Sequence, residues 1–440
     1  MSLWAGEVTV NAAGEQGLRL RGLCLRRQAS DVDASVNWTE RVLARIVGGV
    51  HAIAGEPAAR TIAVEGVERL HTVIDARDVA RVREHVVETL RHDLLTFALR
   101  VGRTVLGWDH EFYVDDYLIL RINFPYEVAC HADPAAENPG IGRVSPQVRE
   151  LAVSRRVVDP LFNPWGYHRN HPPAAWAHGP HRDSWTGHSR DGINIWWAIS
   201  GVPAEAGMVL YPTLNEVELS SDPRSGYLRA GYQLPKPTPA PLAAGEMLVF
   251  DPEVLHGTHL NLTGQTRVAV SIRLNAHPPT FDPACFYARE FWRRASDIEA
   301  GAFDEVLHLK REEHLAARPA PLPMPPTLRP PALVCAAEPS GAVVLGPSAL
   351  VSEGQRVVVT LADRSAMIVR IGGALRAFST ACPHYGVDLA DGAMDETQCY
   401  CPGCGVSFDC ETGQSGSSAL TLASIGVTED GGTIRLTGGC

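Results

Sequence analysis

The clearest helical pattern lies in the first quarter of the chain. Apolar residues recur every three or four positions over residues 36–53 and 78–104, and the second stretch includes the run VARVREHVVETLRHDLLTFALRVG. This spacing gathers apolar side chains on one face of a helix, so two helices that pack against a core are predicted. We therefore expect a helical N-terminal part over about residues 1–106.

From residue 111 the pattern changes to short runs typical of strands. The runs are EFYVDDYLILRINF, GINIWWAIS, AGMVLYP, GEMLVF and RVAVSIRL, and polar or Gly/Pro turns separate them. Several short strands in succession predict a jelly-roll or cupin-like barrel over about residues 110–280. Residues 283–317 return to a helical pattern. The first large unit, residues 1–317, is thus expected to be mainly β with flanking helices.

A proline-rich segment follows this unit. Half of residues 318–331, RPAPLPMPPTLRPP, are proline. Such a sequence cannot form a helix or a central strand and tends to be extended, so we interpret it as an interdomain linker. An ordered crossing over the surface of one domain is the alternative. In residues 332–440, β-rich runs such as RVVVTL and AMIVRI alternate with Gly and Asp turns, which predicts a small antiparallel β domain.

Charge and composition argue against nucleic acid and a membrane as partners. The 440-residue chain has a formal net charge of −11 and no run rich in lysine or arginine, so nucleic acid is not an expected partner. Its first residues do not resemble a signal peptide, and no stretch approaches 18 uninterrupted apolar residues. We therefore expect a cytoplasmic protein with no membrane association. The sequence does not indicate an oligomeric state.

Two clusters of potential metal ligands stand out. In the first, His181 and Asp183 form an HxD pair whose side chains would share one face of an extended strand. His256 follows a predicted strand and is the expected third ligand. Two neutral imidazoles and one carboxylate leave half of an octahedron open, which suits Fe(II) that must bind a cosubstrate and O₂ together.

Other residues near these ligands have alternative roles. His259 could replace His256, and the neighbouring His168, His171, His178 and His188 are expected in loops or in a substrate pocket. Arg267, at the head of the strand RVAVSIRL, could hold a carboxylate through two parallel charge-assisted hydrogen bonds. Arg273 is the alternative for this role.

The order and spacing of these motifs over residues 110–280 resemble the phytanoyl-CoA dioxygenase-like branch of the Fe(II)/2-oxoglutarate-dependent oxygenases. The resemblance implies a double-stranded β-helix in which His181, Asp183 and His256 bind iron and Arg267 binds 2-oxoglutarate. It further implies O₂ as a cosubstrate, with succinate and CO₂ as products. Related halogenases replace the carboxylate by a small residue, so Asp183 favours hydroxylation, desaturation or rearrangement. By analogy, the substrate is a small molecule of secondary metabolism.

The second cluster contains five of the ten cysteines within 29 positions, which in a cytosolic protein suggests a metal site. The sequence CPHYG at 382–386, then CPGCGVSFD at 401–409 and TG at 412–413, resembles a Rieske ferredoxin except for cysteine at 404 in place of histidine. The resemblance implies a [2Fe-2S] cluster bound by Cys382, His384, Cys401 and Cys404. An extra thiolate should lower its potential towards that of plant-type ferredoxins.

Alternatives remain for this cluster and for the whole chain. Three cysteines and one histidine also suit a structural zinc site, a metal-free module is a further alternative, and Cys399 and Cys410 are expected to be packed thiols. A [2Fe-2S] cluster could return Fe(III) to Fe(II), with a reductase or ferredoxin as candidate partner, or could have a structural or oxygen-sensing role. The competing functions are a Rieske non-haem oxygenase and a non-catalytic, cupin-like metal-binding or redox-sensing protein.

A last candidate feature is the aromatic segment over residues 161–180, which precedes the HxD pair. It contains Trp165, Tyr167, His168 and Trp176. These side chains are expected either to line a pocket for a medium-sized organic substrate or simply to pack.

Overall fold

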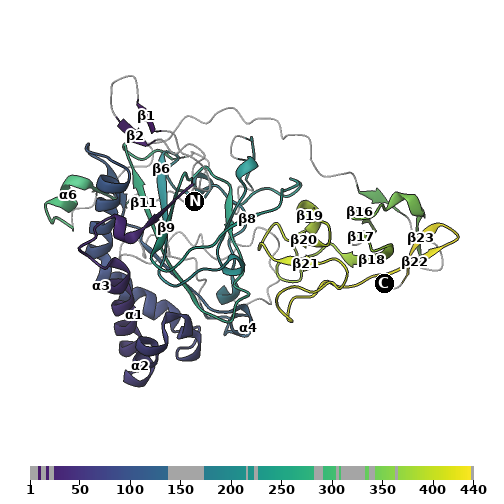
Figure 1. Cartoon of the computed structure of the whole chain (residues 1–440), viewed down its shortest axis with the longest axis horizontal. Coiled ribbons are helices and arrows are strands. Elements are labelled where there is room, and N and C mark those ends of the chain that lie inside the picture. The colour runs from purple at the N-terminus through teal and green to yellow at the C-terminus, as the bar shows by residue number, and fades with distance from the viewer. Residues whose placement is uncertain are drawn as a thin grey trace.

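The structure is a computed structural model that describes residues 8–10, 16–18, 24–136, 173–214, 217–221, 226–281, 291–303, 307–308, 332–335, 342–361 and 365–437. The chain forms a larger lobe that contains the helices and a smaller β lobe beside it (Figure 1). The linker predicted at 318–331 lies outside the described residues. In the described ranges, no helix combines the length and the apolar character needed to cross a membrane.

Two facing sheets form the core of the larger lobe. The main sheet has the order β13-β12-β4-β11-β6-β9-β3, with β5 also paired to β11, and the minor sheet has the order β10-β7-β8. Every pairing in these two sheets is antiparallel. The strands of the main sheet are β3 (Cys24–Gln28), β4 (Tyr113–Asp115), β5 (Ile119–Asn123), β6 (Gly192–Ala198), β9 (Glu246–Phe250), β11 (Arg267–Asn275), β12 (Phe291–Arg294) and β13 (Leu307–His308). Those of the minor sheet are β7 (Met208–Leu210), β8 (Thr238–Ala240) and β10 (His256–Thr258).

Strand β11 shows how the period-two pattern builds this core. Val268 and Ile272 belong to the apolar cluster that includes the helices, whereas Ala269 belongs to a second cluster between the two sheets. Because successive side chains of a strand point to opposite faces, one strand contributes to both layers. The predicted mainly β fold with flanking helices is confirmed.

Of three helices in the N-terminal part, α3 packs against the main sheet, α1 packs against α3, and α2 packs against α1. They are α1 (Trp38–Ala54), α2 (Glu56–Glu65) and α3 (Val79–Arg100), which continues into a π-helical turn at Val101–Val105. Phe97 of α3 contacts Trp38 of α1 at 5.4 Å between ring centroids and stacks on Trp197 of β6 at 4.5 Å. The helices expected at 36–53 and 78–104 are therefore present, and the aromatic contacts fix them to the sheet.

Two expectations about the ends of this lobe are wrong. The N-terminal part is not wholly helical, since β3 pairs with β9 at the edge of the main sheet, and β1 (Val8–Val10) pairs with β2 (Gln16–Leu18). Within 283–317, the described residues form β12, the short helix α6 (Ala295–Glu299) and β13. Strand β12 pairs with β4, so the need to complete the hydrogen bonds of a sheet edge overrides the local helical pattern.

The smaller lobe confirms the predicted small, mainly antiparallel β domain. Its sheets in the described residues have the orders β14-β16-β17-β18, β15-β23-β22 and β19-β20-β21, and of the described pairings between these strands only the short β14–β16 pairing is parallel. The strands are β14 (Leu333–Val334), β15 (Val343–Pro347), β16 (Arg356–Thr360), β17 (Ser365–Ile371), β18 (Ala374–Ser379), β19 (Met394–Asp395), β20 (Gln398–Tyr400), β21 (Ser407–Asp409), β22 (Gly426–Asp430) and β23 (Thr433–Thr437).

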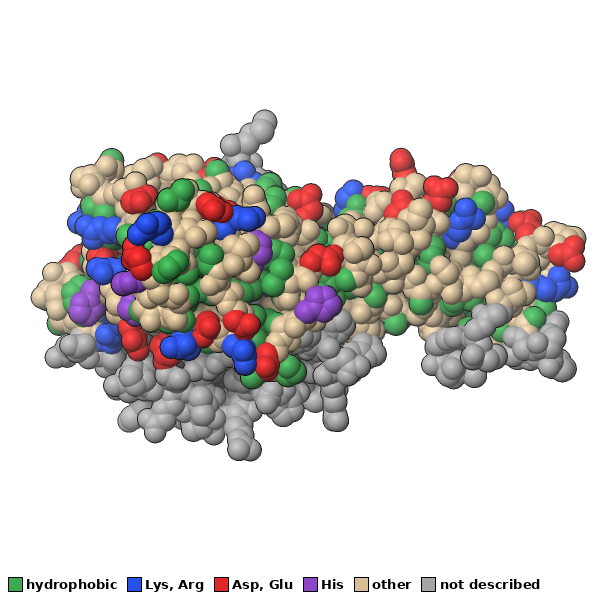
Figure 2. Space-filling model, turned by 90° about the horizontal axis from the view of Figure 1, so that it is seen from below, with side chains coloured by type: hydrophobic (Ala, Val, Ile, Leu, Met, Phe, Trp, Pro, Cys, Tyr) green, Lys and Arg blue, Asp and Glu red, His purple; other side chains and the backbone are tan. Residues whose placement is uncertain are grey.

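Hydrogen bonds join the two lobes at several points. The Leu234 amide donates to the Asp391 carbonyl oxygen at 2.8 Å, and the Gly231 amide donates to the Asp391 carboxylate at 2.9 Å. Lys236 forms an ion pair with Asp395. On the face shown in Figure 2, acidic and basic side chains are interspersed over the larger lobe, which is on the left. The hydrogen bonds and the ion pair hold residues 231–236 of the larger lobe against residues 391–395 of the smaller lobe.

Candidate metal centres

The structure brings His181, Asp183 and His256 together. One potential ligand atom from each lies within 4.8 Å of the others, and all three side chains are buried. The backbones of His181 and His256 form an antiparallel bridge, with reciprocal hydrogen bonds of 2.8 and 3.0 Å. Asp183 begins a 3-10 turn, Asp183–Thr186, instead of continuing a strand as expected. Its amide is held by the Pro252 carbonyl at 2.9 Å, so the turn still directs the carboxylate to the histidines.

Both histidine rings are oriented by their neighbouring backbone. The Nδ1 of His181 lies 2.7 Å from the Gly179 carbonyl oxygen, and the Nδ1 of His256 lies 2.8 Å from that of Val254. With Nδ1–H donating to a carbonyl, the lone pair is on Nε2, and the two Nε2 atoms lie 3.2 and 3.7 Å from Asp183 Oδ1. Burial lowers the pKa of His256 to about 3, so its ring is neutral at physiological pH, as metal binding requires.

Arg273 holds the other oxygen of the Asp183 carboxylate. Its Nε and Nη2 both lie 3.1 Å from Asp183 Oδ2, which leaves Oδ1 directed at the histidines. Burial alone would raise the pKa of Asp183, but Arg273 and then His188 outweigh it and hold that pKa well below its ordinary value. The sequence indicated Arg273 only as an alternative cosubstrate clamp. Its contact with Asp183 had no local sequence signal, because 90 residues separate the two.

The other histidines occupy different positions. His259 lies outside the three-residue group, and its Nδ1 is 2.6 Å from the Leu260 carbonyl oxygen. His178 and His188 are also outside the group, although the His178 ring is 5.8 Å from that of His181. His168 and His171 lie outside the described residues, as do Trp165 and Tyr167 of the aromatic segment. Trp176 is described and buried.

Arg267 is buried at the start of β11. Its guanidinium donates to the Ala206 carbonyl oxygen and to the Asn123 side chain, while its Nε has no hydrogen-bond partner among the described residues. Burial and then Arg121 lower its pKa to about 9, so the group is still cationic at neutral pH. Arg121 of β5 pairs with Ala269 of β11, so its side chain lies on the same face of the sheet as that of Arg267. Its Nε donates a hydrogen bond to the Ser271 hydroxyl. Two cations on one face could bind an anion. No sequence motif indicated Arg121, because its place beside Arg267 arises only from the pairing of β5 with β11.

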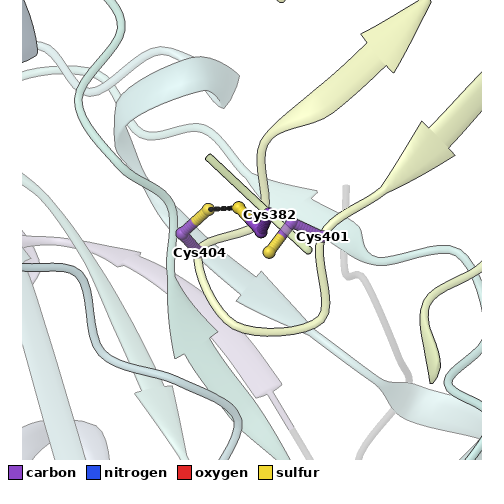
Figure 3. A group of neighbouring side chains, drawn as sticks. All are labelled: Cys382, Cys401 and Cys404. Carbon is purple, nitrogen blue, oxygen red and sulfur yellow. Dashed lines mark hydrogen bonds between the residues drawn. The ribbon is translucent and has the colours of Figure 1, made fainter. Parts of the chain in front are cut away.

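The second group consists of three cysteines in the smaller lobe. The sulfur atoms of Cys382, Cys401 and Cys404 lie within 4.8 Å of one another, and the Cys382 and Cys404 sulfurs are 3.9 Å apart (Figure 3). Cys382 follows β18, whereas Cys401 and Cys404 lie in the turn between β20 and β21. The side chains are at most 1% exposed.

The two cysteine loops share one backbone pattern. In the first, the Cys382 amide donates to the Val387 carbonyl at 2.9 Å and the Gly386 amide donates back to Cys382 at 2.7 Å. In the second, the corresponding bonds join Cys401 with Val406 and Gly405, at 2.8 and 3.0 Å. The matching loops place Cys382 and Cys401 at corresponding positions with their sulfur atoms within 4.8 Å of each other, which suits a cofactor held between the loops.

The donor set fits a [2Fe-2S] group. The Gly403 amide lies 3.4 Å from Cys401 Sγ, so a backbone dipole is directed at this sulfur. His384 is fully buried and its Nε2 lies 3.0 Å from the Ala175 carbonyl oxygen, so coordination by His384 would use Nδ1. His384 is not part of the close group of three sulfurs. Ligands on two different irons need not all adjoin one point, whereas a single tetrahedral zinc ion would gather all four.

The remaining cysteines of this region are buried in the same domain. Contact with Cys410 and then burial raise the pKa of Cys399, so its thiol is protonated. Neither Cys399 nor Cys410 belongs to the group of three sulfurs. Both are fully buried, as expected for packed thiols.

The cysteine loops lie directly against the larger lobe. The Leu260 amide donates to the Cys404 carbonyl oxygen at 3.0 Å, four residues along the chain from His256. At Gly405 the backbone φ is +73°, and a Cβ atom there would lie 3.1 Å from the His259 ring. A larger residue at 405 would therefore be strained and would meet His259. The Cys404 loop therefore packs against the segment that follows His256, although more than 120 residues separate the two metal-binding groups in sequence.

Comparison with known proteins supports two domains. The family model for phytanoyl-CoA dioxygenase (PhyH) matches residues 66–269, and that for the Rieske [2Fe-2S] domain matches residues 341–420. A comparison with curated proteins gives no match.

Similar solved structures cover about a fifth of the chain. The Sphingomonas yanoikuyae B1 ferredoxin is 25% identical over 22% of this chain and 97% of its own, with a TM-score of 0.20. The ferredoxin of carbazole 1,9a-dioxygenase from Nocardioides aromaticivorans IC177 is 22% identical over 22% of this chain and 98% of its own, with a TM-score of 0.21. Apo dicamba monooxygenase is 25% identical over 23% of this chain and 34% of its own, also with a TM-score of 0.21.

The two family matches lie in the order that the sequence motifs indicated, with the PhyH domain before the Rieske domain. Each contains one of the two buried ligand groups. The chain therefore contains a region that matches the PhyH family model, followed by a region that matches the Rieske [2Fe-2S] domain model, and this combination supports an iron-dependent oxygenase.

Proposed function

We propose that the chain is an Fe(II)/2-oxoglutarate-dependent dioxygenase that hydroxylates a small organic substrate. Residues 1–317 form the oxygenase domain, 318–331 the linker and 332–440 the Rieske-like domain. The observation that carries the proposal is the convergence of His181 Nε2, His256 Nε2 and Asp183 Oδ1 in one buried site. Two neutral imidazoles and one carboxylate are the ligand set of this class of iron enzyme.

Iron bound here with 2-oxoglutarate supplies the O₂ chemistry, in which the cosubstrate is converted to succinate and CO₂ while the substrate is oxidised. The protein's own residues orient the iron ligands and enclose the site. The carbonyls of Gly179 and Val254 fix the histidine rings, and Arg273 fixes the carboxylate. The Phe250 ring contacts His256 edge-on at 5.0 Å and helps to exclude water from this side of the site.

Arg267 is proposed to bind the distal carboxylate of 2-oxoglutarate. Three features support this role: its charge at neutral pH, its burial and the Nε without a partner among the described residues. Cys382, His384, Cys401 and Cys404 are proposed to hold the [2Fe-2S] cluster. That cluster supplies electrons that keep the mononuclear iron in the Fe(II) state, with a reductase or ferredoxin as the external donor.

The proposal is tested by succinate formation from 2-oxoglutarate in the presence of Fe(II) and O₂. We expect slow uncoupled turnover without substrate and faster turnover when a panel of small organic molecules contains a substrate. Omission of Fe(II) or O₂ should abolish both rates. Complete absence of succinate, in protein whose iron site is shown to be filled, would favour a non-catalytic metal-binding protein.

The role of Arg267 makes a separate prediction. Loss of a buried, charge-assisted pair costs about 3 kcal/mol, so Arg267→Leu should raise the KM for 2-oxoglutarate about 100-fold. Iron content should be unchanged. Arg273→Leu is the matched comparison, because it should lower iron content instead. Steady-state assays with iron quantification separate the effect on KM from the effect on iron content. If the KM for 2-oxoglutarate rises in Arg121→Leu but not in Arg267→Leu, Arg121 is the residue that binds the distal carboxylate.

A further inference from the structure

The ligand end of the Rieske domain is enclosed by the oxygenase domain. His384 Nε2 lies 3.0 Å from the Ala175 carbonyl oxygen. The neighbouring Tyr385 hydroxyl contacts both the amide and the carbonyl of Ala177. His384 and Tyr385 are at most 2% exposed. An external protein therefore cannot reach the cluster through the edge that carries His384, and this edge faces the segment that leads to the iron ligand His181.

Buried aromatic rings bridge the space between these two histidines. Tyr385 stacks on His384 with 3.5 Å between ring centroids, and Trp176 follows at 6.0 Å from Tyr385. Tyr227 is 6.5 Å from Trp176 and 5.6 Å from His181. We call Tyr385, Trp176 and Tyr227 the aromatic relay. Each ring is at most 7% exposed.

The chemistry of these side chains suits electron transfer. The rate of electron tunnelling falls steeply with distance, and it falls less steeply through packed atoms than across gaps. Contiguous aromatic rings therefore couple two metal groups better than an unfilled space of the same length, without being oxidised themselves. An added electron on the cluster should reside on the iron bound by neutral histidine, because the other iron has two anionic thiolates. An electron that leaves the cluster is therefore expected to leave through His384.

We infer that the aromatic relay, with Trp176 at its centre, carries electrons from the Rieske cluster to the mononuclear iron. The inference rests on the proposed function, in which this iron becomes stranded as Fe(III) when turnover is uncoupled. One electron leaves the reduced cluster, which becomes oxidised, and Fe(III) becomes Fe(II). No bond forms or breaks. The cluster is then reduced again by an external one-electron donor of the reductase or ferredoxin class.

A second route runs along the backbone. Leu260 donates to the Cys404 carbonyl oxygen, and the chain from Leu260 to His256 spans about 14 Å at most. This route contains no aromatic ring of the relay. Substitution of Trp176 therefore distinguishes the two routes, since it leaves the Leu260–Cys404 hydrogen bond in place.

The test uses the full chain, with both metal groups bound and the mononuclear iron oxidised to Fe(III), under anaerobic conditions. A light flash with deazaflavin as the electron source reduces the cluster, and its visible absorbance reports reoxidation. We expect the absorbance of the wild type to recover as the Fe(III) electron paramagnetic resonance signal disappears. Recovery should be about tenfold slower or more in Trp176→Phe and partly restored in Trp176→Tyr.

Trp108→Phe is the matched control, because Trp108 is similarly buried but lies outside the relay. Its recovery rate should equal that of the wild type. If Trp176→Phe loses the cluster, Tyr227→Leu replaces it, because it removes the ring that lies between Trp176 and His181. A wild-type recovery rate in the relay variant with an intact cluster would overturn the inference and assign transfer to the backbone route.

Failure of the proposed function has a different signature. Wild-type protein that forms succinate with ascorbate but shows no transfer from cluster to iron would overturn the relay and leave the oxygenase in place. Protein that forms no succinate with ascorbate, despite a filled iron site, would overturn the proposed function itself.

Discussion

Replacement of Asp183 by alanine is expected to lower iron affinity and succinate formation by at least about 100-fold. The change removes the one anionic group among the three proposed ligands. It also leaves the guanidinium of Arg273 buried without the carboxylate that it contacts at 3.1 Å. Breaking such a buried pair costs about 3–5 kcal/mol, so the melting temperature should fall as well. Iron content after desalting, succinate formation and thermal unfolding measure the three effects.

Asp183→Asn is the matched control for the role of charge. It preserves the shape of the side chain and one oxygen that can accept a hydrogen bond from Arg273. We expect it to fold better than Asp183→Ala and still to bind iron weakly. Retention of stoichiometric iron and full turnover by Asp183→Ala would exclude Asp183 as a ligand.

Replacement of Cys404 by serine is expected to remove the visible absorption of the cluster and its ability to sustain turnover. Serine preserves size but replaces a thiolate with a hydroxyl that binds iron poorly. Succinate formation per iron should fall in reactions that depend on an enzymatic electron donor and should return when ascorbate is added. Unchanged turnover without any reductant would contradict an electron-supply role.

A second substitution at Cys404 tests its effect on the reduction potential of the cluster. Cys404→His restores the usual two-cysteine, two-histidine ligand set of a Rieske centre and removes one negative charge from the cluster. Its reduction potential should therefore rise, by on the order of 100 mV or more. Cys399→Ser is the matched control, because Cys399 is equally buried but lies outside the group of three sulfurs. Its spectrum should resemble that of the wild type.

Local sequence pattern was sufficient for the longest helices and for several central strands. Apolar residues that recur every three or four positions predicted helices α1 and α3, and short β-rich runs predicted strands such as β6, β9 and β11. The helix expected around 283–317 failed at β12, where pairing with β4 decides the conformation. Helix α2 is short and lies between Gly55 and Gly66, so its pattern gave little signal.

The residues grouped at the two centres could be read from motifs, but their surroundings could not. HxD spacing and the CPH and CPGC sequences identify ligand types without reference to the fold. In contrast, the ion pair of Arg273 with Asp183 and the hydrogen bond of Leu260 to Cys404 join segments far apart in sequence. Such contacts arise only when strands and domains pack, so no local pattern records them. Trp176 appeared in the sequence only as one aromatic residue among several.

Metal and acid-labile sulfide analysis of the full chain, together with its visible spectrum, tests most directly whether one chain combines a mononuclear iron site with a [2Fe-2S] cluster. We expect about three irons and two sulfides per chain, with an iron–sulfur absorption that Cys404→Ser removes. One iron with one zinc per chain, and no visible absorption from the C-terminal domain, would contradict this prediction.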